Sequence, residues 1–264
     1  MNRLERLFAE SRRTGRKALV VYVCAGDPDL AATERLVPAL AEAGADVIEL
    51  GVPFSDPLAD GPTIQAASQR ALQSGTTLSG VLALVGRLRQ RGCDVPLVLF
   101  GYVNPILSMG LERFVQEAAE AGADGVLVAD LPLEESGPLG RLAEASGLSL
   151  VLLAAPTTPP ERLRAIGQAT RGFLYFVSVT GVTGARAELP VDLPEKLAAA
   201  RAATKAPLAV GFGISTPEQA QALARHADAV VVGSALVAAL HGDTSGAEGV
   251  ALVRSLAAAV RSAR

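Results

Sequence analysis

Eight short apolar runs, each followed by a segment of helical composition, constrain the fold of this chain more than any other feature. The predicted strands are Ala18–Val23, Val47–Leu50, Val95–Phe100, Gly125–Val128, Leu148–Leu153, Phe173–Val177, Leu208–Val210 and Ala229–Val232. The predicted helices are Leu30–Ala43, Leu78–Arg91, Leu111–Ala121, Leu139–Ser146, Pro160–Gln168, Leu193–Ala203, Pro217–Arg225 and Glu248–Arg261. Short strands that are apolar throughout are typical of a parallel sheet covered on both faces. Eight such units predict a closed (β/α)8 TIM barrel, and an open doubly wound sheet is the alternative.

Further features concern the ends of these elements. An extra N-terminal helix is expected over Leu4–Ser11, and a short helix over Ile64–Gln73. Three side chains precede predicted helices and are placed to cap them: Asp29, Thr158 and Thr216. The phrase Ala-Gly-Ala-Asp precedes a strand at Ala43–Asp46 and again at Ala121–Asp124, which either repeated β/α units or turn chemistry explains. No linker-like tract interrupts the pattern, so residues 1–264 are expected to form a single barrel domain.

The bulk composition excludes several function classes. A formal net charge of -3 gives no electrostatic reason to bind nucleic acid or an anionic membrane surface. No apolar run approaches the roughly 18 residues of a membrane-spanning helix, and the charged N-terminus is unlike a signal peptide. Cys24 and Cys93 lack metal-ligand spacing and fit a reducing compartment. A cytoplasmic protein is therefore expected.

One strand carries a carboxylate. Successive strand residues point to opposite faces, so Val47, Glu49 and Gly51 share one face of the predicted strand. A glutamate in an apolar strand is unfavourable unless it is paired or functional. Backbone donors or an arginine could satisfy Glu49. Its position near a strand exit favours catalysis instead, with a pKa raised by desolvation.

A second carboxylate, Asp60, ends the Pro-, Gly- and Asp-rich loop that follows this strand. Asp before Gly is common in turns, so a turn residue is the alternative interpretation. Together, Glu49 on a rigid strand and Asp60 on the next loop predict a proton-transfer pair.

Glycine-rich exits from the last two strands predict a phosphate site. Gly211–Thr216 leads from the seventh strand into a helix, and Gly233-Ser234 follows the eighth and opens a short helix. Backbone N–H groups at helix starts bind phosphate, and barrels often place that site at strands seven and eight. The loop from Ser178 to Asp192 is long and contains glycines, which predicts either a mobile surface loop or a lid over bound ligand.

The lysines and histidines argue against two other chemistries. Lys17, Lys196 and Lys205 all lie away from predicted strand exits, which disfavours Schiff-base aldol chemistry. His226 and His241 form no cluster with the cysteines, so a metal site is not expected. Carboxylate acid/base catalysis on a small phosphorylated molecule remains.

Three stretches together, Glu49–Pro62, Gly181–Gly184 and Gly211–Ser215, resemble the alpha subunits of tryptophan synthase, and the resemblance covers essentially the whole chain. It implies a (β/α)8 barrel that cleaves indole-3-glycerol phosphate by a retro-aldol reaction to indole and glyceraldehyde 3-phosphate. By this resemblance Glu49 matches the principal catalytic acid/base and Asp60 matches its partner.

The resemblance also implies a set of binding residues. The phosphate-binding residues would be Gly184, Gly213, Gly233 and Ser234. The residues lining the indole pocket would be Tyr22, Phe100, Leu127, Ala129, Tyr175 and Phe212, for which core packing is the alternative. Thr183 would join Asp60 when the lid closes. Family members often carry Phe in place of Tyr22 and a basic residue in place of Val179.

The resemblance implies a partner as well. The family forms an α2β2 heterotetramer with a beta subunit, which holds pyridoxal phosphate and receives the indole, so no cofactor is expected in this chain. Loops near Pro53, Asp56 and Asn104-Pro105 would form the contact. Other functions remain open: another phosphate-binding barrel enzyme acting on a sugar phosphate, an interaction subunit without catalysis, or a free-standing indole-3-glycerol phosphate lyase.

Overall fold

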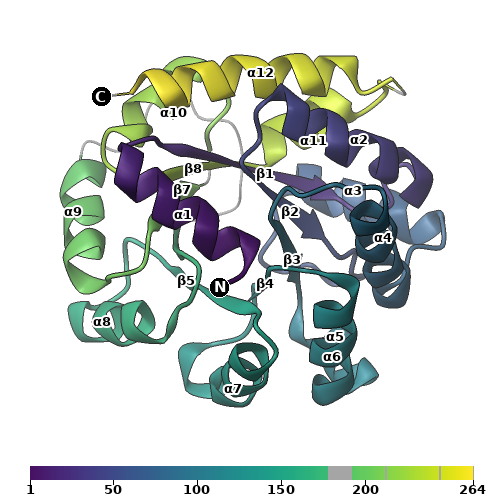
Figure 1. Ribbon diagram of the computed structural model, residues 1–264, viewed down its shortest axis with the longest axis horizontal. Coiled ribbons are helices and arrows are strands. Elements are labelled where there is room, and N and C mark those ends of the chain that lie inside the picture. The colour runs from purple at the N-terminus through teal and green to yellow at the C-terminus, as the bar shows by residue number, and fades with distance from the viewer. Residues whose placement is uncertain (178–191, 212, 244, 264) are drawn as a thin grey trace.

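Eight parallel strands close into a barrel in a computed structural model that describes residues 1–177, 192–211, 213–243 and 245–263 (Figure 1). The strands are β1 (Ala18–Cys24), β2 (Val47–Gly51), β3 (Leu97–Gly101), β4 (Gly125–Val128), β5 (Ser149–Ala154), β6 (Leu174–Val177), β7 (Leu208–Gly211) and β8 (Ala229–Val232). They pair in chain order, and β8 pairs with β1 to close the ring. The predicted barrel is thus confirmed, and the open sheet is excluded.

Helix α1 precedes the first strand, and the other helices follow the strands around the outside of the barrel. They are α1 (Arg3–Thr14), α2 (Leu30–Ala43), α3 (Pro62–Gln73), α4 (Leu78–Gln90), α5 (Val103–Met109), α6 (Leu111–Ala121), α7 (Gly137–Ala145), α8 (Pro160–Ala169), α9 (Leu193–Ala203), α10 (Pro217–Ala224), α11 (Ser234–Leu240) and α12 (Ala247–Ser262), with a 3-10 turn η1 (Leu133–Glu135). Within the described ranges, no helix is long and apolar enough to cross a membrane.

One helix, α5, was not expected from the sequence. Its residues Asn104 and Pro105 are typical of a turn after a strand. Pro105 stands third in the helix, however, where its missing N–H removes no intrahelical hydrogen bond. The segment can therefore continue as a short helix that begins directly after Tyr102.

Two of the three predicted helix caps are confirmed. The carboxylate of Asp29 accepts a hydrogen bond from the N–H of Ala32 at 2.6 Å, and Thr216 forms a reciprocal capping box with Gln219. The prediction for Thr158 is wrong because α8 begins one residue later, after Pro159. The Thr158 hydroxyl instead accepts a hydrogen bond from the N–H of Ala155 at 2.9 Å.

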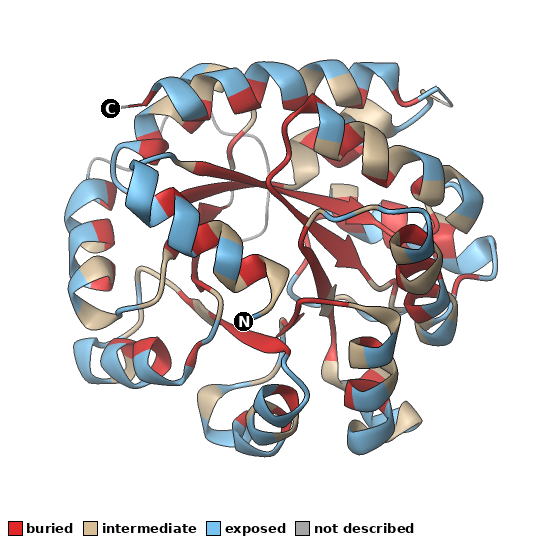
Figure 2. Cartoon of the chain, in the orientation of Figure 1, coloured by how far each residue is buried: buried red, intermediate tan, exposed pale blue. Residues whose placement is uncertain are grey.

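The strands separate two apolar layers, as the alternation in β2 predicts. Val47 belongs to the barrel interior, whereas Ile48 and Leu50 pack in the layer between the strands and the helices. Figure 2 shows strands buried along their length and helices buried on the side that faces the barrel. Helix α1 lies across the barrel in Figure 1 and inserts Leu4 and Phe8 into the interior layer, which closes the N-terminal end.

Three aspartates fasten neighbouring strands together at this N-terminal end. Asp46, Asp124 and Asp228 are the residues immediately before β2, β4 and β8. Each carboxylate accepts the N–H of one leucine at or near the start of the preceding strand, and each backbone N–H donates to the carbonyl of that same leucine at 2.8 Å. The leucines are Leu19, Leu97 and Leu208. We call this pair of hydrogen bonds between one aspartate and one leucine an aspartate clamp. The clamps of Asp46 and Asp124 give the recurring Ala-Gly-Ala-Asp phrase a structural role.

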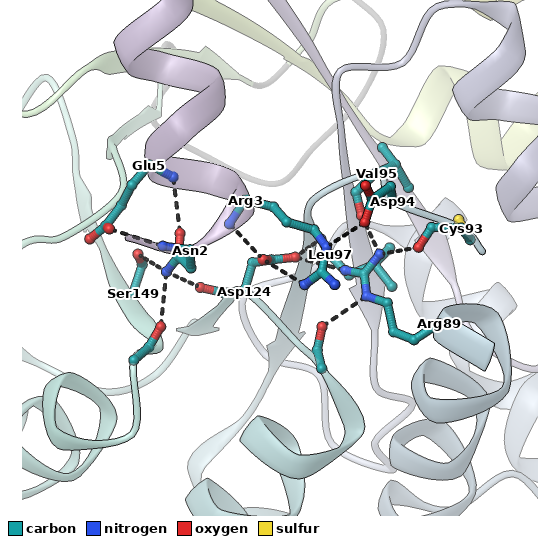
Figure 3. Close-up of polar contacts among 12 residues, drawn as sticks. Asn2, Arg3, Glu5, Arg89, Cys93, Asp94, Val95, Leu97, Asp124 and Ser149 are labelled. Carbon is teal, nitrogen blue, oxygen red and sulfur yellow. Dashed lines mark hydrogen bonds and ion pairs between the residues drawn. The ribbon is translucent and has the colours of Figure 1, made fainter. Parts of the chain in front are cut away.

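The most buried of these clamps is that of Asp124, which is fully inaccessible to solvent. Figure 3 shows its carboxylate between two arginines, with Arg89 Nη2 at 2.7 Å and Arg3 Nη1 at 3.4 Å. The side chain of Asn2 donates to the Asp124 carbonyl at 3.0 Å. The clamp therefore fixes the start of α1 as well as the β3–β4 pair.

Replacing Asp124 with alanine is expected to lower the free energy of unfolding by about 3–5 kcal/mol, because two arginines and a buried N–H lose their acceptor. Urea denaturation followed by circular dichroism measures the change. Asp94→Ala is the matched control, since Asp94 also pairs with Arg3 at 2.9 Å but is exposed. Equal losses in the two variants would contradict a special role for the buried clamp.

Candidate active site

A pocket opens at the C-terminal ends of the barrel strands. The residues that line it are Tyr22, Asp60, Thr63, Ile64, Phe100, Tyr175, Gly213, Ile214, Ser215, Val231, Gly233, Ser234, Ala235 and Ala238. Seven of the predicted site residues are therefore brought together: Tyr22, Asp60, Phe100, Tyr175, Gly213, Gly233 and Ser234. They come from segments spread over most of the chain, which is how a barrel assembles a site from its strand exits.

Glu49 lies in β2, between its register partners Tyr22, which lines the pocket, and Val98; Glu49 itself is not one of the lining residues. Its side chain is 1% exposed, and no hydrogen-bond partner for its Oε1 exists among the described residues. Desolvation raises the pKa of Glu49 to about 8, so the carboxyl group is protonated at neutral pH. An unpartnered carboxylic acid at this position can give up a proton to a bound molecule.

Asp60 ends the loop between β2 and α3 and lines the pocket. Tyr102 donates a hydrogen bond from its hydroxyl to Asp60 Oδ2 at 2.9 Å. Burial raises the pKa of Asp60 to about 6, and the hydrogen bond from Tyr102 opposes that rise. At pH 7 Asp60 is thus mostly ionised while Glu49 is mostly protonated. Two carboxyl groups with separated pKa values are the usual sign of distinct acid/base roles.

The positions of the pocket tyrosines Tyr22 and Tyr175 depend on two glycines, Gly51 and Gly211, which are the last residues of β2 and β7. Tyr22 meets Phe100 edge to face, with ring centroids 5.4 Å apart. A Cβ atom at Gly51 would lie 2.0 Å from the Tyr22 hydroxyl oxygen, and one at Gly211 would lie 2.3 Å from that of Tyr175. Both positions exclude a larger residue unless the tyrosine moves.

The other two described pocket candidates lie elsewhere. Leu127 is fully buried in the barrel interior, in the same apolar cluster as Tyr175, and does not line the pocket. Ala129 follows β4 and lines a separate hollow with Asp130 and Leu131. Both residues were assigned to the indole pocket by the family resemblance. Since neither lines the pocket described here, their contact with an indole ring stays a prediction.

Two segments with free backbone donors or a glycine turn also line the pocket. Helix α11 begins at Ser234 without a side-chain cap, so its first N–H groups have no intrahelical acceptor. Gly213 has a left-handed backbone with φ of 76°, and it lines the same pocket as Gly233 and Ser234. An anion such as phosphate fits donors of this kind.

Some predicted residues lie outside the described part of the chain. The predicted lid falls largely on 178–191, which contains Val179, Thr183 and Gly184, and Phe212 is also outside. Sequence reasoning in turn missed the role of Tyr102, the hydroxyl partner of Asp60. Its position immediately after β3, at the rim of a barrel, was the available signal.

Comparison with known proteins gives one consistent result. The family model described as "Tryptophan synthase alpha chain" matches residues 8–262. The tryptophan synthase alpha chain of Geobacter sulfurreducens is 56% identical over 237 residues, which cover 90% of this chain and 89% of the relative. That of Caulobacter sp. (strain K31) is 51% identical and covers 100% of this chain and 98% of the relative.

Solved structures agree with these relatives. The crystal structure of tryptophan synthase subunit alpha from Legionella pneumophila superposes with a TM-score of 0.91 at 39% identity and covers 98% of both chains. A structure of Mycobacterium tuberculosis tryptophan synthase gives 0.90 at 39% identity, again with 98% coverage of both chains.

Glu49→Gln is expected to stabilise the protein increasingly as pH rises. The folded-state pKa of Glu49 is about 8, above the usual value of 4.5. The wild-type protein therefore becomes less stable as the pH rises from about 4.5 to about 8, because the unfolded chain ionises more readily. The difference in free energy of unfolding between variant and wild type should grow in favour of the variant by about 4 kcal/mol from pH 5 to pH 9. Urea denaturation at both pH values, with the exposed Glu112→Gln as control, measures this. A difference independent of pH would show that the Glu49 carboxyl is not the cause.

Proposed function

The chain belongs to the tryptophan synthase alpha chain family, and we propose that Glu49 and Asp60 are the residues that carry the reaction of this family in the barrel described above. It is a carbon–carbon lyase of tryptophan biosynthesis that cleaves indole-3-glycerol phosphate to indole and glyceraldehyde 3-phosphate. The observation that best supports the assignment of residues is that the chain holds both a buried Glu49, whose Oε1 has no partner among the described residues, and a pocket-lining Asp60 of lower pKa.

In the proposed mechanism Glu49 moves two protons. Cleavage of the carbon–carbon bond requires a proton on indole C3 and loss of the proton from the side-chain hydroxyl. Protonated Glu49 donates to C3, and the resulting carboxylate accepts the hydroxyl proton while the electrons of the broken bond return to the ring. Glu49 is again protonated at the end of the cycle, so one side chain serves both steps.

Asp60 contributes charge in this mechanism. Protonation of C3 places positive charge on the ring nitrogen, and an ionised carboxylate at the pocket wall stabilises that intermediate. The side chain is largely buried, so solvent screens the interaction less than at an exposed position. Glu49 and Asp60 thus need opposite protonation states at the start, which their pKa values of about 8 and about 6 supply near neutral pH.

The substrate is proposed to lie across the pocket. Its ring would contact Tyr22, Phe100 and Tyr175, and its phosphate would accept hydrogen bonds from the backbone at Gly213 and at Gly233-Ser234. The family resemblance adds Leu127, Ala129, Thr183 and Phe212 to the ring contacts and Gly184 to the phosphate contacts.

A tryptophan synthase beta subunit is the proposed partner, in an α2β2 heterotetramer within the cytoplasm. It would receive the indole and hold pyridoxal phosphate, with no cofactor in this chain. Of the expected contact residues, Asp56 and Asn104 are exposed, whereas Pro53 is buried. Leu58 is 92% exposed and Leu107 is 58% exposed on the same rim, and two exposed leucines favour a protein contact.

The purified chain is expected to convert indole-3-glycerol phosphate to equal amounts of indole and glyceraldehyde 3-phosphate, faster with a beta subunit present. Glu49→Gln should lower kcat by at least about 10²–10⁴-fold, because one residue serves two proton transfers. Equal rates with and without the partner would indicate a free-standing lyase. Tight substrate binding without any product would contradict the assigned chemistry and favour an interaction subunit.

The dependence of kcat/KM on pH should be bell-shaped, with an acidic midpoint near pH 6 and a basic midpoint near pH 8. Activity falls below pH 6 because Asp60 becomes protonated, and above pH 8 because Glu49 loses its proton. Steady-state assays from pH 5 to pH 9 measure the profile. Activity that keeps rising above pH 9 would rule out a protonated Glu49 as the starting state.

A further inference from the structure

The hydroxyl group of Tyr102 forms hydrogen bonds with Ala59 and with Asp60. We propose that Tyr102 is a positioning residue for the reaction: its hydroxyl orients the Asp60 carboxylate toward the pocket and favours its ionised form. This inference rests on the proposed function of Asp60. Tyr102 itself does not line the pocket, so it acts through Asp60.

The Tyr102 hydroxyl contacts two consecutive residues at the end of the loop. It accepts a hydrogen bond from the N–H of Ala59 at 3.1 Å and donates one to Asp60 Oδ2 at 2.9 Å. A backbone N–H can only donate, so this contact leaves the hydroxyl proton available for the carboxylate. An ionised carboxylate accepts that proton, whereas protonation of Oδ2 would remove an acceptor. The arrangement therefore both fixes the direction of Asp60 and favours its charge.

Tyr102 is itself held by two neighbouring segments of the chain. The residue after it, Val103, donates its N–H to Asp130 Oδ1 at 2.8 Å. The Tyr102 ring lies against Phe54, with centroids 5.4 Å apart. Phe54 is in turn fixed through both of its backbone groups by the Ser68 hydroxyl, at 2.9 and 3.0 Å. The hydroxyl is thus placed by the segments that follow β2, β3 and β4.

Asp60 needs such support because it is mostly buried. No arginine or lysine in the described part of the chain forms an ion pair with it. Burial alone raises the pKa of Asp60 toward the protonated form at neutral pH, and the bond from Tyr102 acts against this. The hydroxyl replaces the missing cation as the group that favours the charged carboxylate.

Tyr102→Phe tests the inference because it keeps the ring and removes only the hydroxyl. The titration of Asp60 is measured first, by NMR of its carboxyl carbon in the ligand-free chain. Its midpoint is expected to rise by about one pH unit, the effect of one hydrogen bond to a charged group. The acidic midpoint of kcat/KM should move by the same amount, so the activity loss is about tenfold near pH 5 and small near pH 8.

Two comparisons separate positioning from a structural effect. Thr170→Val removes a buried hydroxyl that accepts the N–H of Leu152 at 3.0 Å, at the other end of the barrel. It should lower stability without moving the pH profile. In an Asp60→Asn background, Tyr102→Phe should add little further loss of kcat/KM, because the group on which it acts has already been removed.

An unchanged Asp60 titration in Tyr102→Phe would overturn the inference, as would an equal loss of activity at every pH. The NMR titration needs no turnover. If the chain failed to cleave indole-3-glycerol phosphate at all, the proposed function would fall, while the Asp60 titration would still decide whether Tyr102 sets its charge.

Discussion

The buried carboxyl group of Glu49 in β2, whose Oε1 has no hydrogen-bond partner among the described residues, is the constraint on which the rest of the structure depends. Burying an ionisable group without a partner is unfavourable, and the protein avoids the charge by keeping the group protonated near neutral pH. A rigid strand is needed to hold the side chain there, since a flexible segment would turn it toward water. The closed barrel provides that rigidity, because β2 is bonded on both sides along its length.

Buried carboxyl groups lie at both ends of the barrel, but only those at the N-terminal end are paired with arginine among the described residues. At the N-terminal end Asp46, Asp124 and Asp228 are each paired with arginine and a backbone N–H, and they fasten strands and α1 together. At the C-terminal end Glu49 and Asp60 have no arginine partner among the described residues. Pairing gives structural support, whereas the absence of a countercharge leaves pKa values near the physiological range. Stability and chemistry are thereby separated within one fold.

Sequence patterns predicted most of the fold because strand and helix periodicity is local. The eight strands follow from short apolar runs, and the shared face of Val47 and Glu49 follows from the alternation of side chains along one strand. The partner of Asp60 could not be found in this way, since Tyr102 is 42 residues away and meets it only once the barrel closes. The helix α5 was missed for a related reason, because Asn104-Pro105 is equally compatible with a turn and with the first turn of a helix. Leu127 and Ala129 do not line the pocket with the other described ring-contact candidates, so their contact with an indole ring stays a prediction from the resemblance alone.

The position of Tyr102 also connects the site to the rim of the barrel. Exposed Leu58 directly precedes Ala59, which donates to the Tyr102 hydroxyl, and exposed Leu107 lies on α5, which begins directly after Tyr102. A partner that packs on these two leucines would press on both segments that hold the hydroxyl in place. The 2.9 Å hydrogen bond from the Tyr102 hydroxyl to Asp60 depends on the distance and angle that these segments set. A contact at this rim would therefore act on the segments that place the Tyr102 hydroxyl beside Asp60.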